Sequence, residues 1–292
     1  MTRALACLAL SLISSPLLAG TGGEIAYSAG REVYLINQDG SGKRLLYRGA
    51  TGTSIFSITM KSNGGELSFE EVGKTGQNGR LITVSYGPSG AGSVTRDISG
   101  CRWNASTRDD GALLAVDSCI GRVKFIAAGS STQTDLGIVQ STKVSWMPDG
   151  SFLYTSGGTI RLGSLANPTG SQIRVQDCVQ NLNGAHSASE ALVSVGSICD
   201  GPRIDRMLVP SGSATHIAAG PDAAYSQDDA CYIFISPVRR GAYLLIAPID
   251  GSSSSKPLGG FADYKSVDWR GDSQPTACRV AASNPLQFRE VK

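Results

Sequence analysis

The chain has 292 residues, of which 41% are hydrophobic and 17% charged, and its formal net charge is +2. The hydrophobic fraction is too high for a disordered chain, and the charged fraction is too low for a coiled coil or a helical repeat array. A net charge near zero also argues against a nucleic-acid binder, which needs a strongly basic surface. The 36 glycines indicate many tight turns, as in β architectures.

The N-terminal segment, residues 1–20, has the pattern of a cleaved secretory signal peptide. Arg3 supplies the positive charge, residues 4–13 are apolar, Pro16 interrupts the segment, and Ala19 is small. The apolar part is shorter than the ~20 residues that span a bilayer, and no later stretch is apolar enough to do so. We therefore expect a monomeric periplasmic or secreted protein without a membrane span.

The remaining chain, residues 21–292, repeats one unit: an apolar run, a tight turn and a second apolar run. The turns lie about 39 to 46 residues apart, which is the spacing of propeller blades built from four antiparallel strands. Their positions are 63–65, 109–111, 148–150, 187–190, 227–229 and 271–273. Six turns predict an all-β fold, a six-bladed β-propeller that forms a single domain.

The third and fourth units show the predicted strands most clearly. Their interiors are nearly all apolar, as expected where both faces of a sheet are buried between neighbouring blades. A β-sandwich, the alternative architecture, would show cleaner alternation and less regular turns. The predicted strands are 101–106, 112–118, 123–127 and 132–136 in the third unit, and 144–146, 152–156, 159–165 and 172–175 in the fourth.

The first unit lacks an innermost strand. It begins with residues 24–27 and continues with 32–38 and 44–48, whereas residues 265–269 near the C-terminus resemble the missing strand. This pattern predicts that the C-terminal strand completes the first blade, which closes the ring and removes unpaired sheet edges.

The cysteines predict disulfides. Cys7 leaves with the signal peptide, and six cysteines remain, an even number that suits an oxidising compartment. One pair is symmetric about residue 110 and a second about the turn near residue 188, so each hairpin should place its two cysteines opposite each other. The last pair is assigned by elimination. The three predicted pairs are Cys101 with Cys119, Cys178 with Cys199, and Cys231 with Cys278.

Several segments resemble the repeat of the TolB-type, WD-repeat-like, six-bladed β-propeller family. In the first unit they are Ile25–Ser28, Val33–Asn37, Asp39–Gly42 and Arg44–Leu46, and in the fourth the segment Val144–Gly150 is similar to the Trp-Ser-Pro-Asp-Gly turn of the family. Met147 stands where the family has Ser. The resemblance implies a propeller fold and, as in relatives that act mainly in the periplasm, a role as an interaction module.

No motif for catalysis is visible. The chain has no GxSxG, HExxH or Walker phosphate loop, and no GxGxxG that opens a helix. Its two histidines, His186 and His216, do not lie at ligand spacing from Cys or carboxylates, so we expect neither a metal nor a cofactor. The alternative function is a carbohydrate-active enzyme, a glycan hydrolase or lyase, with paired carboxylates in the central funnel.

The positions of the charges predict a binding face. Turns between second and third strands share one face of the ring, and five of six blades place a cation there. The opposite face collects acidic residues in the first-to-second turns, where turn chemistry also favours Asp. The sequence therefore predicts that the basic face binds an anionic envelope protein or peptide, or an envelope polyanion. The predicted basic residues are Arg31, Lys74, Arg80, Arg122, Arg203, Arg239 and Arg240; the acidic ones are Asp109, Asp110, Asp149, Glu190, Asp228, Asp229 and Asp272.

Overall fold

The computed structural model describes residues 23–270, apart from residues 62–63, 77, 89–90, 186, 197–198, 200 and 227. The expected signal peptide (residues 1–20), the turn at 271–273 with Asp272, His186 and Cys278 therefore lie outside the described residues. No helix in the described part of the chain is long and apolar enough to cross a membrane.

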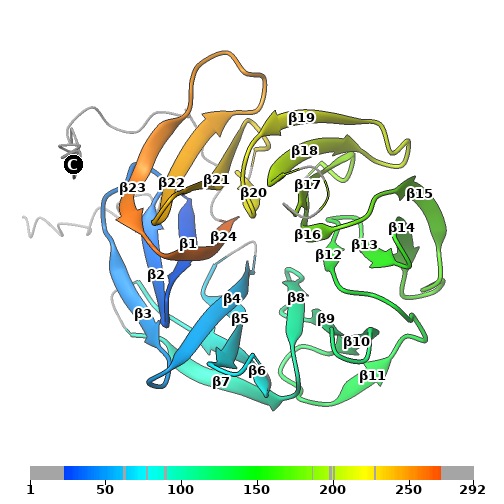
Figure 1. The fold of residues 1–292 in the computed structure, drawn as a ribbon. Coiled ribbons are helices and arrows are strands. Elements are labelled where there is room, and N and C mark those ends of the chain that lie inside the picture. Colours follow the sequence, from blue (N-terminus) through cyan, green and yellow to red (C-terminus); the bar gives the residue numbers. More distant parts are fainter. Residues whose placement is uncertain are drawn as a thin grey trace, which may run out of the picture.

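Within this part, 24 strands form six four-stranded antiparallel sheets around a central axis (Figure 1). The predicted six-bladed β-propeller is confirmed. From the innermost strand outwards, blade one contains β24 (Tyr264–Arg270), β1 (Glu24–Ala29), β2 (Glu32–Asn37) and β3 (Arg44–Arg48); blade two contains β4 (Thr53–Met60), β5 (Glu66–Gly73), β6 (Gly79–Ser85) and β7 (Ser93–Ser99); blade three contains β8 (Trp103–Thr107), β9 (Leu113–Asp117), β10 (Arg122–Ile126) and β11 (Gln133–Asp135).

The other three blades have the same order of strands. Blade four contains β12 (Val144–Trp146), β13 (Ser151–Ser156), β14 (Thr159–Ser164) and β15 (Ser171–Val175); blade five contains β16 (Val179–Gly184), β17 (Glu190–Val195), β18 (Arg203–Leu208) and β19 (Ala214–Ala218); blade six contains β20 (Ala223–Tyr225), β21 (Cys231–Val238), β22 (Gly241–Pro248) and β23 (Lys256–Ala262). All the strands predicted in the third and fourth units are present, with ends shifted by two residues at most.

The ring closes as predicted. β24 pairs with β1 in antiparallel register, from Glu24 opposite Arg270 to Ala29 opposite Tyr264. Figure 1 shows this strand, in orange, beside the blue β1 at the inner edge of blade one. The last described strand therefore ties the two ends of the propeller together. It is one residue longer at each end than the predicted strand.

The hydrophobic core lies between the blades, with one cluster at each of the six interfaces. In β9, Leu113 and Ala115 pack in the cluster shared with blade two, while Leu114 and Val116 pack in the cluster shared with blade four. Since alternate side chains of a strand point to opposite faces, a blade buried on both sides needs apolar residues throughout. This arrangement explains the runs without alternation.

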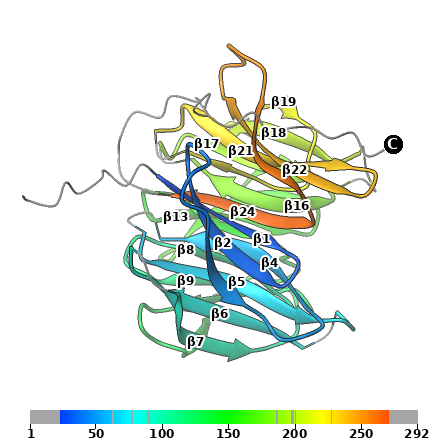
Figure 2. The same cartoon turned by 90° about the vertical axis from the view of Figure 1, so that its left-hand side faces the viewer.

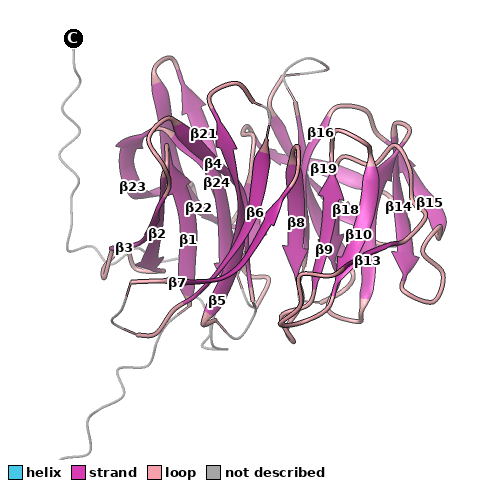
Figure 3. Cartoon of the chain, turned by 90° about the horizontal axis from the view of Figure 1, so that it is seen from below, coloured by secondary structure: helices cyan, strands magenta, loops and turns pink. Residues whose placement is uncertain are grey.

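The disc has two faces, and its strands run from one to the other (Figure 3). The connections from second to third strands, and those from each fourth strand to the next blade, share one face. We call it the funnel face, because the axial cavity lies at this end of the ring. The remaining turns form the opposite face. The connection of residues 249–255, between β22 and β23, projects beyond the rim (Figures 1 and 2).

Candidate functional site

The innermost strands are joined around the axis by side chains. A polar side chain from each blade bonds to the next blade, so all six interfaces carry such a bond; at the interface of blades five and six it joins the side chains of Asn181 and Asp222. Elsewhere the acceptor takes a backbone N–H: Ile58 N to Ser266 Oγ (2.9 Å), Met60 N to Asp268 Oδ2 (2.7 Å), Thr107 N to Thr59 Oγ1 (2.9 Å), Val144 N to Asn104 Oδ1 (3.0 Å), Trp146 N to Ser106 Oγ (2.9 Å), Gly184 N to Ser145 Oγ (2.9 Å) and Val267 N to Asp222 Oδ2 (3.0 Å).

A cavity of about 620 Å³ lies on the axis at the funnel face. It is built where the innermost strands begin, so each blade contributes residues from its first strand or from the connection before it. Its walls mix aromatic, cationic and amide side chains, which suits a polar ligand that also offers apolar surface. The lining residues that matter most for charge and shape are Phe56, Arg102, Lys143, Asn181, Asp222 and Tyr264.

Lys143 is a cation of this cavity whose ammonium has no ion-pair or hydrogen-bond partner among the described residues. It directly precedes β12, is only partly exposed, and no described residue accepts a hydrogen bond from its Nζ. Burial lowers the pKa of this ammonium, and the charges of Asp222 and Glu70 partly offset that effect. A partly desolvated, unpaired ammonium gains most from a ligand that brings an anionic group.

Arg102 is another cation of the cavity, and Glu70 holds it. Glu70 is 2% exposed and accepts bonds from Arg102 Nε (2.9 Å), Arg102 Nη2 (3.3 Å) and Trp103 N (2.6 Å). The guanidinium also lies 5.5 Å from the centre of the Phe56 ring. These contacts join blade two to blade three and fix Arg102 at the cavity wall, where it is 40% exposed.

Asp222 is a buried carboxylate that directly precedes β20, the innermost strand of blade six. Oδ1 accepts bonds from Asn181 and from Ala223 N (2.9 Å), and Oδ2 accepts bonds from Ser266 Oγ (2.8 Å) and Val267 N (3.0 Å). Burial raises its pKa to about 6 although these donors oppose the shift. Each oxygen thus already has two donors, which is typical of a structural carboxylate.

The two predicted hairpin disulfides are present, and both lie beside the cavity. Cys101 and Cys119 are bonded with Cα atoms 5.9 Å apart, and Cys178 and Cys199 with Cα atoms 6.2 Å apart. Each ties the start of an innermost strand to the connection after the second strand of the same blade, next to the cavity residues Arg102 and Val179 respectively. Cys231 is buried at the start of β21, and its pairing with Cys278 stays a prediction.

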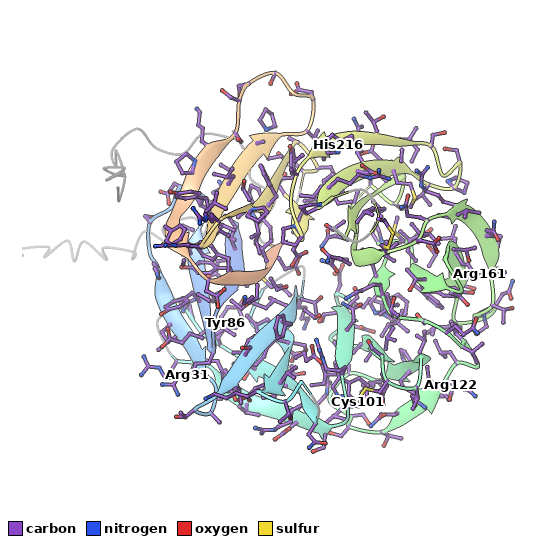
Figure 4. The ribbon with its side chains drawn as sticks, viewed as in Figure 1. Arg31, Tyr86, Cys101, Arg122, Arg161 and His216 are labelled. Atoms are coloured by element: carbon purple, nitrogen blue, oxygen red, sulfur yellow. A yellow bond between two sulfur atoms is a disulfide. The ribbon has the colours of Figure 1, made fainter. Side chains whose placement is uncertain are left out.

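The seven basic residues predicted from the sequence all lie in, or within two residues of, the second-to-third connections of the funnel face. Three of them already contact carboxylates. Arg80 pairs with Glu71 and Asp97, Arg122 lies 4.0 Å from Asp135, and Arg203 lies 3.1 Å from Asp205, while Arg31 donates to Thr51 Oγ1 at 2.9 Å. Figure 4 shows Arg31 and Arg122 toward the outside of the ring, far from the axial cavity.

The other three, Lys74, Arg239 and Arg240, are exposed, and none of them contacts a carboxylate in the described part of the chain. Within the predicted set, the cations without a carboxylate partner among the described residues are therefore these three, and the axial Lys143 lies on the same face. The seven predicted residues share one face of the ring, and their role in binding stays a prediction; they differ in how much charge they can offer.

Exposed apolar side chains also lie on the funnel face. Of the nine large hydrophobic residues exposed in the described chain, five lie in its connections or at the strand ends beside them. They are Ile120, Val139, Val175, Val238 and Phe261. Apolar side chains among charged ones are typical of protein-binding surfaces.

The acidic residues of the opposite face have local roles. Asp110 accepts the N–H of Ala112 (2.9 Å), Asp149 that of Ser151 (2.9 Å) and Asp228 that of Ala230 (3.2 Å). Such bonds close tight turns. Turn chemistry therefore accounts for these aspartates without a ligand, and it makes the funnel face the better candidate.

Sequence reasoning missed the cavity residues Arg102, Lys143 and Asp222. All three lie directly before an innermost strand, in the connections from the fourth strand of one blade to the first strand of the next. The same order of strands from the axis outwards that located the basic turns also places these connections around the axis. The usable signal was the position before each innermost strand.

No family model and no curated protein matches the chain. Among solved structures it is similar to TolB from Acinetobacter baumannii, at 13% identity and a TM-score of 0.70, over 86% of this chain and 67% of that one. A putative TolB from Agrobacterium tumefaciens has 12% identity and a TM-score of 0.60, over 84% and 91%. An oligogalacturonate lyase in complex with manganese has 15% identity and a TM-score of 0.50, over 76% and 73%. The fold is thus that of a TolB-type β-propeller.

In residues 23–270, as far as they are described, no group of three or more His, Cys, Asp or Glu side chains is placed to hold a metal ion. The two carboxylates of the cavity, Glu70 and Asp222, instead bond to protein donors.

Proposed function

We propose that this protein is a non-catalytic interaction module that binds an anionic protein or peptide segment on its funnel face. The observation that carries this proposal is the combination on one face of three things: the axial cavity with the unpaired Lys143, the exposed cations Lys74, Arg239 and Arg240, and five exposed apolar side chains. Arginine binds carboxylates through two parallel hydrogen bonds, and the apolar residues supply contact area.

The partner we favour is an acidic peptide segment rather than a small molecule. An extended segment can place one carboxylate near Lys143 and others near the two arginines at the rim of blade six. The fold of TolB proteins supports an interaction role at the level of architecture. Much of the attraction would be between exposed charges, so binding should weaken steeply with salt.

We also propose that the protein acts in the periplasm or outside the cell. The signal-like pattern of residues 1–20 and the two disulfides support this location, because disulfides persist in oxidising compartments. Fractionation of cells that express the full chain, with a periplasmic and a cytoplasmic marker, tests it. Recovery with the cytoplasmic marker alone would contradict it.

The experiment for binding is capture from an envelope fraction by the purified, tagged protein, followed by mass spectrometry. The test variant, R239E/R240E, reverses two exposed cations of the funnel face. The control variant, K61E/K256E, reverses two charges on the opposite face, where Lys61 and Lys256 flank a first-to-second and a third-to-fourth turn.

We expect wild type and the K61E/K256E control to capture the same partner, and R239E/R240E to lose at least ~10-fold of it, since each charged hydrogen bond contributes about 1.5–3 kcal/mol. K143M should weaken capture as well if the partner enters the cavity. Equal capture by R239E/R240E and by wild type would refute the proposed face.

A carbohydrate-active enzyme is the second candidate. The observation in its favour is that both Glu70 and Asp222 line the cavity, and that the pKa of Asp222 is raised toward that of a general acid. Against it, both carboxylates are almost fully buried and bonded to protein donors. Incubation with oligogalacturonate and manganese, followed by ultraviolet detection of unsaturated products, tests this candidate; turnover would favour the enzyme.

A further inference from the structure

A second site lies on the outer part of the ring, between blades four and five. Here a hollow of about 520 Å³ is lined by Arg174 of β15, Arg203 and Asp205 of β18, and His216 of β19. Figure 4 places His216 at the outer edge of the ring. The hollow shares no lining residue with the axial cavity, so it is a separate feature of the surface.

Asp205 orients two of the nitrogen-bearing side chains. It stands opposite His216 in the β18–β19 register, and its carboxylate is 7% exposed. Oδ2 accepts a bond from Arg203 Nε at 3.1 Å, and Oδ1 lies 3.5 Å from His216 Nδ1. Because Nδ1 faces Asp205, the other ring nitrogen, Nε2, points away from it. The protonated imidazole can then donate Nε2–H to a ligand.

Arg174 reaches the hollow from the neighbouring blade. Its Nη1 donates to Gly212 O at 2.9 Å and its Nε to Gln176 Oε1 at 3.2 Å. These two bonds hold the guanidinium in one orientation, and Nη2 has no acceptor among the described residues. The side chain is therefore prearranged, with a donor left for a ligand.

We propose that this hollow binds a phosphate monoester. Arg174 and Arg203 place two guanidinium groups around it, and the imidazole of His216 adds a third cation when it is protonated; among the described lining residues, Asp205 is the carboxylate. Guanidinium groups donate charge-assisted hydrogen bonds to the oxygens of phosphate, and a dianion gains more from several cations than a carboxylate does. The volume exceeds that of phosphate alone, which leaves room for the group esterified to it. Free glycerol phosphate and a phosphorylated side chain both carry this group, and the test below distinguishes them.

The test is calorimetric titration of the folded full domain with inorganic phosphate, phosphoserine and glycerol phosphate at constant ionic strength set by chloride. We expect saturable binding, and tighter binding of the monoester that matches the natural source. R174Q and H216Q should each weaken binding by ~10-fold or more, and R174K, which keeps the charge but loses the fork, should weaken it less. Both side chains lie at the surface, and thermal melting checks that the variants fold.

R239Q, in blade six and outside the lining of the hollow, is the matched control and should leave phosphate binding unchanged. Conversely, R174Q should leave capture of the funnel-face partner unchanged, so each of the two proposals can fail without the other. The absence of saturable binding for all three probes would overturn the phosphate site. So would equal binding by wild type, R174Q and H216Q.

Discussion

The carboxylate of Asp222 accepts the backbone N–H of Val267 at 3.0 Å, across the seam where the propeller ring closes. Asp222 lies just before β20 of blade six, whereas Val267 is in β24, the strand that completes blade one. The other oxygen of the carboxylate bonds to Asn181 of blade five. One buried side chain therefore joins three blades at the place where the ends of the chain meet.

The first prediction concerns this joint. D222A removes the acceptor of Val267 N and of Ser266 Oγ. A buried donor without a partner costs about 1–3 kcal/mol, so we expect a loss of ~2 kcal/mol or more in the free energy of unfolding. Urea denaturation measures this. The control is D39A, which removes an exposed turn acceptor of Ser41 N and should cost ~1 kcal/mol or less. Equal losses of unfolding free energy in D222A and D39A would contradict the role of Asp222 in joining the blades.

The second prediction is the pH dependence of this contribution. The pKa of Asp222 rises from 3.8 to about 6 on folding, so the folded state holds the proton more tightly than the unfolded state. The resulting stabilisation is complete below about pH 4 and is lost as pH rises to about 6, with a total of roughly 3 kcal/mol. D222N, which does not titrate, serves as the reference. The stability of wild type minus that of D222N should fall between pH 4 and pH 7; a constant or rising difference would show that the sign is wrong.

The sequence predicted the ring, its closure and two disulfides because these features depend on spacing. A cysteine pair placed symmetrically about a hairpin turn meets whatever the rest of the fold does, as Cys101 and Cys119 do. The innermost strand of blade one could be found by its absence from the first unit. Both inferences can be made without knowledge of tertiary contacts.

The electrostatics of the site could not be predicted in the same way. Arg102 and Glu70 are 32 residues apart and meet only because blades two and three pack side by side. From the sequence, Arg80 is an available cation, whereas in the fold its guanidinium pairs with Asp97. A charge in the sequence indicates a face of the ring, whereas its effective strength depends on neighbours that the fold brings together.

The third prediction tests the closing strand. A chain ending at Tyr264 lacks nearly all of β24, which leaves β1 as an open sheet edge and removes Trp269 from the core, where it is 1% exposed. We expect aggregation, or a melting temperature at least ~10 °C lower, because loss of a buried Trp alone costs about 3–5 kcal/mol. A chain ending at Arg270 is the control: it lacks the same tail but keeps β24. Similar melting of the two truncated chains would refute the role of the strand.

The fourth prediction concerns the disulfide beside Arg102. The two cysteines are 18 residues apart, and a cross-link that closes a loop of this size stabilises by about 3 kcal/mol in the chain-entropy model. C101S/C119S should lose a similar amount in urea denaturation. This disulfide also anchors the connection at the cavity wall. Capture of a partner that contacts Lys143 should therefore weaken as well. Unchanged stability of this variant would indicate that contacts in blade three alone hold the hairpin.

The last prediction compares two glycines in third-to-fourth connections. Gly170, between β14 and β15, and Gly129, between β10 and β11, both have positive φ, of 44° and 66°. A Cβ at Gly170 would lie 1.9 Å from the carbonyl oxygen of Leu162, whereas a Cβ at Gly129 meets nothing within 4 Å. Both alanine variants carry the cost of a left-handed backbone, roughly 1–2 kcal/mol.

Only G170A must also move backbone, and the movement displaces the Thr169 carbonyl that accepts the Tyr154 hydroxyl at 2.6 Å. We therefore expect G129A to lose about 1 kcal/mol and G170A about 3 kcal/mol or more, since overpacking alone costs about 1–3 kcal/mol. Thermal unfolding of the two variants beside wild type measures the difference. Because both sites are in equivalent connections of adjacent blades, equal losses would mean that the connection before β15 rearranges freely and that its close approach to β14 contributes nothing to the stability of blade four.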